Sequence, residues 1–533
     1  MISRMIRRLL TAVLAAAPLL VAAQPLRLDK GNTLQQVKFM KFFDFLTASY
    51  VDSLDNSHLI ETAITSILSE LDPHSSYSSP EEMKAINESF EGSFSGIGIE
   101  FDVLKDTIIV VNTIAGGPAE KVGIRANDRI VNVDGVSAIG STRADVPRLL
   151  RGKRGSKVAL DIRRDSGENV SFTVTRDDIP LHTVDAAYLA APEIGYIKVN
   201  RFAHNTMSEF LDAYRRIGSP ESLILDLRGN GGGLLEQAIL LSEFFLPEGA
   251  LIVSTEGRSV ATHNYRSAGN TAFGNGKVVV LIDHSSASGS EIVAGAIQDW
   301  DRGIIIGRQS FGKGLVQQQV PLPDGSAVRI TVARYHTPSG RVIQRPFEHG
   351  DRQGYYLDLA RRSTDDAYAD SMRRSAPSYK TLRTGRTVTG GGGITPDIVI
   401  PTDTTAFSTY LLRLVNQGII NEYVLSYFDR NRNSLAAQYD DINDYIERFA
   451  VTQPMLDELA DAADAHGIEY DEAGMATSRE WIEDYMRALI AMKLYGTEGY
   501  YRVINQGPQA LDYKRAVEVL SDWEHLGEPL LMP

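Results

Sequence analysis

The stretch KVVVLIDHSSASGSEIVAGAIQDW (residues 277–300) predicts a strand, a turn and a helix in succession. The apolar, β-branched run at residues 277–283 is typical of a buried strand, and residues 291–300 have the pattern of an amphipathic helix. The turn between them holds Ser285, Ser286, Ser288 and Ser290. A serine at such a turn either caps the helix or serves an enzyme as its nucleophile, and the surrounding chain has to decide between these roles.

Strands and helices alternate on both sides of this stretch. The strand IGYIKVNRF (194–202) comes first, and SLILDLRGNGGG (222–233) is a strand that ends in a glycine turn. A helical pattern at residues 234–246 follows it, and the strand GIIIGRQS (303–310) comes after the opening stretch. This order predicts an α/β sheet with helical crossovers over residues 179–402.

The rest of the chain differs in pattern and predicts a multidomain α+β protein. Residues 32–90 are helical in pattern, with a new helix expected at Pro80 because two glutamates follow it. Residues 91–178 are short strands punctuated by glycines, which indicates a compact β-rich module. Residues 403–533 predict a helical, acidic C-terminal region.

Residues 1–23 have the composition of a secretory signal peptide. Three arginines precede the apolar run at residues 9–23, which ends in small residues and is short for a membrane span. We therefore expect a periplasmic or secreted protein, either free or associated with the cell envelope. An uncleaved membrane anchor is the alternative for this segment.

Composition excludes several kinds of function. The chain has 533 residues and a formal net charge of −14, which argues against nucleic-acid binding. It contains no cysteine, so disulfides, thiolate nucleophiles and cysteine metal sites are excluded. The metallopeptidase motif H-E-x-x-H is absent as well, and we expect no metal and no cofactor.

The β-rich module contains GIGIEF (96–101) and GGPAEKVGIRANDRIVNVDG (116–135), a pattern that resembles a PDZ domain over residues 91–178. Such domains bind the C-terminus of another chain as an added strand. The resemblance implies that the backbone of the glycine loop holds the terminal carboxylate, with contacts from Gly96, Ile97, Gly98 and Ile99. A glycine-rich hairpin in a module that binds nothing is the alternative.

The glycine turn in LILDLRGNGGGLLEQA (223–238) exposes backbone N–H groups where a strand meets a helix. Such groups can stabilise developing negative charge, although many α/β proteins have an ordinary connection of this kind. A phosphate-binding loop is disfavoured because the turn lacks the lysine of that motif.

A candidate base lies in QSFGKGLVQQQV (309–320), where Lys313 stands between two glycines in an apolar setting. Burial lowers the pKa of a lysine and so allows it to act as a general base. Ser288 and Lys313 follow consecutive strands, and adjacent parallel strands would bring both to one edge of the sheet. The alternatives are a helix cap formed by Ser288 with Glu291 and a solvated surface lysine. A Ser–His pair is the other catalytic possibility, with His336 ahead of His284 and His204.

The block SASGSEIVAGAIQDWDRGIIIGRQSFGKGLVQ resembles the active-site block of the carboxyl-terminal processing (tail-specific) serine proteases, in a Bacteroidetes-like form. LDPHSSY, DLRGNGGG and GGGGITPD extend the resemblance over roughly residues 34–402. It implies a crotonase/ClpP-like core in which Ser288 is the nucleophile, Lys313 the general base and Gln317 the residue that orients the lysine. The implied oxyanion hole combines the amide of Gly289 with one from residues 231–233, namely Gly232 or Gly233.

We therefore expect an exported serine endopeptidase that recognises free C-terminal tails of proteins. As its partner we expect a second copy of the chain, in a homodimer, or an activating adaptor protein. Two rivals remain open, a PDZ-type peptide-binding scaffold without catalysis and an esterase or amidase that acts on small substrates.

Overall fold

The computed structural model describes residues 30–114, 116–164, 166–269 and 273–533. The expected signal peptide, residues 1–23, lies outside the described residues. The chain divides after Ile67 into two units. Helix α2 (Lys30–Ser49) belongs to the first unit, and α3 (Asn56–Ser69) continues into the second.

The helix expected at Pro80 is present as α4 (Pro80–Glu91), which follows the short strand β1 (Ser76–Ser78). Proline occupies the start of the helix, where its missing N–H has no intrahelical acceptor to lose. Ser79 caps the helix and Glu82 returns a hydrogen bond to the Ser79 amide at 2.9 Å. The local sequence therefore determines where this helix begins.

The β-rich module is built on an antiparallel sheet around its own apolar core. Its strands are β3 (Ile99–Leu104), β4 (Thr107–Thr113), β5 (Arg129–Val133), β6 (Val136–Ser137), β7 (Lys157–Arg163) and β8 (Asn169–Thr175). Two short helices, α5 (Pro118–Val122) and α6 (Val146–Leu150), contribute side chains to that core. The chain enters and leaves the module side by side, because β2 (Ser93–Gly96) pairs with β9 (Asp177–Pro180).

The larger core holds the predicted α/β sheet, in the order β10-β11-β12-β15-β16-β21. Its strands are β10 (Val184–Ala191), β11 (Ile194–Val199), β12 (Ser222–Asp226), β15 (Lys277–Ile282), β16 (Ile304–Gly307) and β21 (Ile398–Val399). All neighbours pair in parallel except β10 with β11. The loops after β12, β15 and β16 therefore leave one edge of the sheet, and they carry the glycine turn, Ser288 and Lys313.

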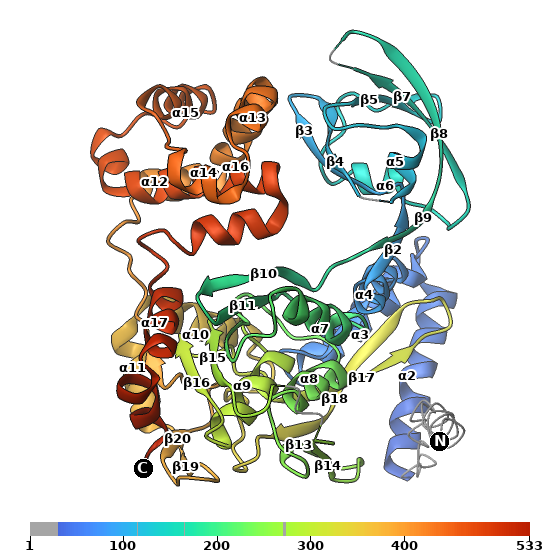
Figure 1. The fold of residues 1–533 in the computed structure, drawn as a ribbon. Coiled ribbons are helices and arrows are strands. Elements are labelled where there is room, and N and C mark those ends of the chain that lie inside the picture. Colours follow the sequence, from blue (N-terminus) through green and yellow to red (C-terminus); the bar gives the residue numbers. More distant parts are fainter. Residues whose placement is uncertain (1–29, 115, 165, 270–272) are drawn as a thin grey trace, which may run out of the picture. The chain divides into compact units, whose positions relative to one another are not determined.

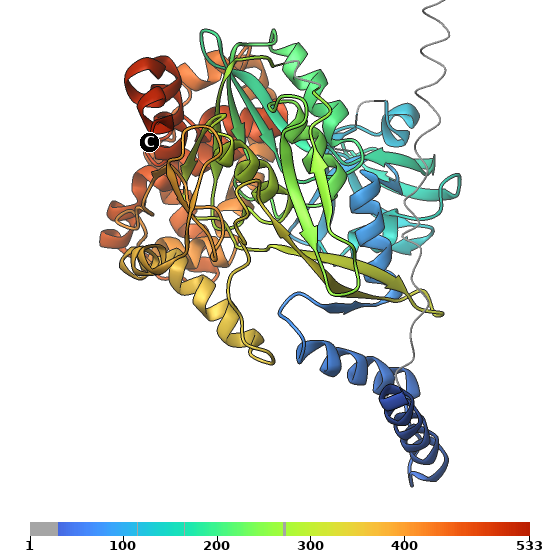
Figure 2. The same ribbon diagram turned by 90° about the horizontal axis from the view of Figure 1, so that it is seen from below.

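Helices cover both faces of this sheet, which explains why its strands are mostly apolar. On one face lie α7 (Thr206–Arg216), α8 (Leu235–Glu243) and α9 (Gly289–Asp299), which share a core with alternate residues of the strands. The opposite face packs against α17 (Leu511–Ser521). Figure 1 and Figure 2 show α17, in red, on the other side of the sheet from the green helices.

A second, antiparallel sheet lies outside the predicted arrangement. It joins β1 to β18 (Ala327–His336), which also pairs with β13 (Leu251–Glu256) and β17 (Leu315–Pro321). Strand β14 (His263–Arg266) pairs with β13 at its end. Because β1 follows the loop that carries His74 and β17 follows Lys313, this sheet brings two distant loops together.

Two helices and a hairpin lie between β18 and β21. They are α10 (Arg352–Thr364), α11 (Asp366–Ser375), β19 (Ser378–Lys380) and β20 (Thr387–Thr389).

The C-terminal region is helical as predicted, but it belongs to two cores. Five helices form a cluster of their own: α12 (Thr409–Asn416), α13 (Ile419–Gln438), α14 (Ile442–Arg448), α15 (Gln453–Ala465) and α16 (Glu472–Ile504). Helix α17, by contrast, completes the core of the large sheet. Among the described helices, none combines the length and apolar character that crossing a membrane requires.

Candidate active site

The backbone conformation distinguishes Ser288 from the other serines of its turn. Ser288 is the N-cap of α9 and has φ +52° and ψ −109°, a region that residues other than glycine rarely enter. Such a conformation costs about 1–3 kcal/mol and tends to occur where function requires it. Some hydrolases expose their nucleophile on a strained serine between a strand and a helix in the same way.

The other serines have structural roles or lie at the surface. The hydroxyl of Ser286 donates to the carbonyl oxygen of Leu227 at 2.8 Å, and that of Ser290 donates to Asn230 at 2.8 Å. Both serines are fully buried, so Ser290 fastens α9 to the glycine turn and Ser286 fastens the turn before α9 to the end of β12. Ser285 is exposed, and its amide donates to Asp283. Ser288 is thus the serine that the geometry favours as a nucleophile.

Glu291 joins the segment of Ser288 to that of Lys313. Its fully buried carboxylate oxygen Oε2 accepts the amide of Ser288 at 2.8 Å and the amide of Lys313 at 2.9 Å. The other oxygen accepts the Ser310 hydroxyl at 2.6 Å and the Gly312 amide at 2.7 Å. Burial raises the pKa of Glu291, while these four hydrogen bonds favour its charged form. The capping role expected for Glu291 is present, and it also positions the lysine.

Tyr335 makes a second connection between the same two segments. Its buried hydroxyl lies 3.1 Å from the carbonyl oxygen of Ser288 and 2.6 Å from that of Lys313. One buried carboxylate therefore binds the amides of both residues, and one buried phenol contacts their carbonyls. The backbones of the expected nucleophile and base are held in a fixed relation.

His336 follows Tyr335 on β18, so its side chain points to the opposite face of that strand. Its Nε2 lies 3.8 Å from a carboxylate oxygen of Glu256. The geometry therefore gives no support to the Ser–His alternative based on His336.

Lys313 has the environment that a basic lysine needs. Burial is the largest influence on its pKa and lowers it below the usual value of 10.5, and the positive charge of Arg329 adds to the shift. Glu291 and Asp72 oppose this shift without cancelling it. A lysine with a lowered pKa is more often neutral at a given pH and can then accept a proton.

Lys313 opens into a cavity of about 660 Å³. The cavity is also lined by His74, Gly231, His284, Ser285, Ala287, Phe311 and four residues of α10. No pattern in the sequence indicates a role for His74, although it lies in the LDPHSSY motif. Its Nε2 is 3.1 Å from the hydroxyl of Tyr355, and burial followed by the charge of Lys313 lowers its pKa to about 4. His74 is therefore a neutral part of the cavity wall.

Gln317, expected to orient the lysine, lies on β17. Its amide Nε2 donates to the backbone carbonyl of His74 at 2.7 Å. The glutamine thus links the strand after Lys313 to the loop that carries His74. Its role toward the lysine stays a prediction.

The glycine turn lies directly against Ser288. Gly232 has φ +98°, and a Cβ atom there would lie 2.7 Å from Cβ of Ser288 and 3.0 Å from the amide nitrogen of Gly289. The N–H of Gly232 donates to the side chain of Asn230 at 2.8 Å, so this amide, expected in the oxyanion hole, is already engaged. Gly233 has φ +146° and packs against the carbonyl oxygen of Phe202. The turn must therefore be glycine at both positions.

A small groove in the β-rich module brings together the expected peptide-binding residues. Gly96, Ile97, Gly98 and Ile99 line it together with Phe94, Phe101 and residues of α6, namely Val146, Pro147, Leu150 and Arg151. Gly98 has φ +75°, which favours glycine at the loop. The groove is largely apolar and runs between β3 and α6.

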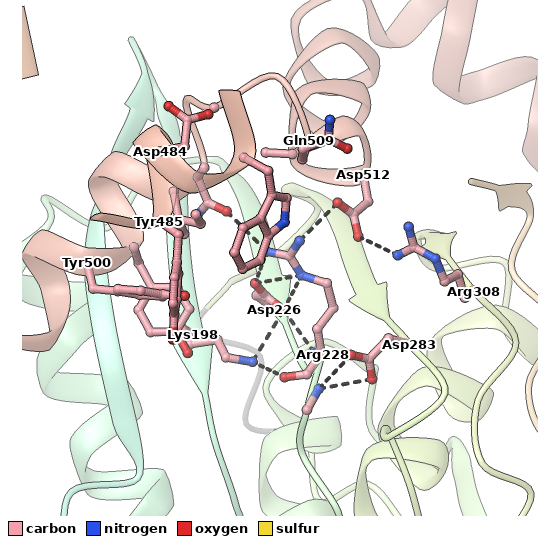
Figure 3. Close-up of a pocket in the computed structure, with 17 residues that line it drawn as sticks. Lys198, Asp226, Arg228, Asp283, Arg308, Asp484, Tyr485, Tyr500, Gln509 and Asp512 are labelled. Carbon is pink, nitrogen blue, oxygen red and sulfur yellow. Dashed lines mark hydrogen bonds and ion pairs between the residues drawn. The ribbon is translucent and has the colours of Figure 1, made fainter. Parts of the chain in front are cut away.

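A second cavity, of about 430 Å³, lies where the sheet meets α16 and α17 (Figure 3). Arg228 donates there to Asp226 of β12, to Asp512 of α17 at 3.0 Å and to Asn505 at 3.2 Å. Burial raises the pKa of Asp226, but Arg228 and Lys198 outweigh burial and hold this pKa well below its usual value. Because Arg228 precedes the glycine turn, these contacts attach the C-terminal helices to the loop that touches Ser288.

Comparisons with known proteins agree with both modules. Residues 193–349 match peptidase family S41, and residues 95–175 match the PDZ domain. Residues 410–496 match a family of unknown function, DUF8443. This last match covers most of the separate helical cluster.

A carboxy-terminal-processing protease of Bartonella bacilliformis is 38% identical over 353 residues, which cover 64% of this chain and 81% of that protein. The carboxy-terminal processing protease CtpA of Bacillus subtilis is 34% identical over 311 residues, or 58% of this chain and 66% of that protein. The solved structure of a photosystem II D1 C-terminal processing protease is similar over 70% of this chain and 94% of that one, with 26% identity and a TM-score of 0.35. On the strength of its curated relatives, this chain belongs to the carboxy-terminal processing serine proteases of peptidase family S41.

Proposed function

We propose that the protein is an exported endopeptidase that captures the C-terminal tail of a protein substrate in its PDZ groove and cleaves peptide bonds with a Ser288–Lys313 dyad. The observation that supports this proposal most strongly is the strained backbone of Ser288. Buried Glu291 and Tyr335 each form hydrogen bonds with the backbones of both Ser288 and Lys313. Export rests on the composition of residues 1–23 and implies a periplasmic or secreted enzyme. A second copy or an activating adaptor would be its regulator.

In the proposed reaction, neutral Lys313 removes the proton from the Ser288 hydroxyl as Oγ attacks the substrate carbonyl. The Oγ–C bond forms, and the amides of Gly289 and Gly233 stabilise the negative carbonyl oxygen. When the C–N bond breaks, Lys313 gives its proton to the leaving amine, and the acyl group stays on Ser288. Water then attacks the acyl carbonyl carbon while Lys313 takes a proton from it. The Oγ–C bond breaks, the substrate fragment leaves with a new carboxyl group, and Lys313 passes the proton that it took from water to Oγ of Ser288.

Capture of a free tail is tested by amidating it. An unfolded reporter protein with an apolar C-terminal tail should be cleaved about 10–100-fold more slowly, as kcat/KM, when the tail is amidated, because a hydrogen-bonded charge is worth about 1.5–3 kcal/mol. As the control, a side-chain carboxylate elsewhere in the same reporter is converted to an amide while the tail stays free. Equal rates with free and amidated tails would contradict carboxylate capture. Binding of the free tail without any cleavage would favour the scaffold alternative.

The lowered pKa of Lys313 predicts how activity depends on pH. The lysine is a base only when neutral, so kcat/KM should rise as pH increases through its pKa, with a midpoint below the usual 10.5. The profile is measured on a short peptide over the range in which circular dichroism shows the fold intact. A rate that falls as pH rises through this range would exclude a neutral lysine as the base.

A further inference from the structure

One side of α10 faces the catalytic cavity. Tyr356, Leu359, Ala360 and Ser363 line the cavity that also contains Lys313, and they follow the i, i+3, i+4, i+7 spacing of a single helix face. The match to peptidase family S41 ends at residue 349, before this helix begins. The catalytic cavity thus has a wall that the family match does not include.

The wall is firmly attached to the catalytic loops. Tyr355 precedes Tyr356 and is buried, with its hydroxyl 3.1 Å from Nε2 of His74. The guanidinium of Arg345 stacks over the Tyr355 ring at 3.9 Å, and the Arg345 amide donates to the carbonyl of Gly312 at 2.9 Å. Because Gly312 is next to Lys313, the position of α10 is set relative to the expected base.

Ion pairs fix the rest of the helix. Asp358 pairs with Arg362 at 2.8 Å within the helix and with buried Arg345 at 3.5 Å. These contacts use the side of α10 that faces the protein and leave the side with Tyr356 and Ala360 directed to the cavity.

The chemistry of the wall defines what it accepts. An aromatic, an aliphatic, a methyl and a hydroxyl side chain face the cavity from α10, and Phe311 adds a second aromatic ring. A charged side chain placed against them would lose hydration without gaining a partner of opposite charge from this helix. An apolar side chain would bury area at about 25 cal/mol per Å².

We propose that Tyr356, Leu359 and Ala360 form the specificity wall of the protease, which selects an uncharged, apolar side chain next to the scissile bond. The inference rests on the proposed function and adds α10 as the element that contacts the substrate side chain beside the scissile bond. Ala360 lies in the middle of the stripe, so its small side chain sets the size of the residue that fits.

The test compares cleavage sites rather than overall rates. Wild type, Ala360→Trp and Tyr356→Ala digest an unfolded reporter protein with an apolar C-terminal tail, and mass spectrometry identifies every new terminus. For apolar residues beside the cleaved bond, Ala360→Trp should lower the ratio of kcat/KM for large residues to kcat/KM for small ones by about 10-fold or more. Differences in pocket size typically change specificity by this amount. Tyr356→Ala should widen the tolerated sizes. Both positions are exposed, so the substitutions leave the buried contacts of the helix in place.

Leu357→Ala provides the matched control, because Leu357 lies on the same helix, outside the stripe, with 61% of its surface exposed. Its cleavage profile should equal that of wild type. Cleavage that depends on Ser288 but has the same profile in Ala360→Trp, Tyr356→Ala and wild type would overturn the specificity wall alone. Cleavage that survives Ser288→Ala would overturn the proposed function itself, and with it the wall as part of that site.

Discussion

Replacing Ser288 with alanine should reduce kcat for cleavage of an unfolded protein by about 10⁴-fold or more, because loss of a catalytic nucleophile removes the covalent route and leaves only binding and the oxyanion contacts. The substitution deletes one hydroxyl. It keeps the Ser288 amide on Glu291 and the carbonyl near Tyr335. The measurement is single-turnover cleavage at enzyme excess, with circular dichroism to show that the fold persists.

Ser285→Ala is the matched control, since Ser285 lies in the same turn, is exposed and hydrogen-bonds through its backbone amide. Its rate should stay within a few-fold of wild type. A serine-reactive phosphonate should label wild type and Ser285→Ala, but not Ser288→Ala. Full activity in Ser288→Ala would refute the nucleophile assignment.

Lys313 is tested alongside by substitution with arginine and with alanine. Arginine retains the positive charge but stays protonated at any working pH, so it cannot accept the serine proton. Both variants should lose about as much activity as Ser288→Ala, because residues that act as one unit show non-additive effects. The double variant should accordingly be no slower than either single variant, and a further large loss in it would indicate separate roles.

The sequence predicted those parts of the site that depend on local pattern and on neighbouring strands. Ser288 and Lys313 each follow an apolar strand, and β15 and β16 are adjacent and parallel in the structure. The sequence also predicted Glu291 as the capping partner of Ser288, because the spacing of the two residues is that of a capping box. It did not predict that Glu291 also accepts a hydrogen bond from the amide of Lys313, because that contact depends on how two loops meet.

The parts that the sequence missed come from long-range packing. His74 reaches the cavity through pairing of β1 with β18, and no periodicity in its own segment signals this. No pattern in the sequence indicates a role for Tyr335, which points to the opposite face of β18 from its neighbour His336. Helix α17 was assigned to a C-terminal helical region, but its apolar side covers the large sheet. An amphipathic pattern shows that one side is buried and does not show against what.

Gly232→Ala should reduce kcat by about 10²–10³-fold with a smaller effect on KM, because it displaces Ser288, the proposed nucleophile, and disturbs the turn expected to stabilise the oxyanion. The added Cβ would lie 2.7 Å from Cβ of Ser288 and 2.8 Å from the carbonyl oxygen of Ala287, distances that non-bonded carbon and oxygen atoms do not tolerate. The φ of +98° adds backbone strain for any residue with a side chain.

Gly231→Ala distinguishes this collision from a general effect on the turn. Gly231 is the neighbouring residue, and a Cβ placed there meets no atom within 4 Å. Its activity should stay within several-fold of wild type, while Gly232→Ala also loses phosphonate labelling of Ser288. If Gly232→Ala were as active as Gly231→Ala, the turn would be free to move away from Ser288. The contacts of Asn230 with Ala287 and Ser290 argue against that freedom, since they fasten the turn to the helix that begins at the serine.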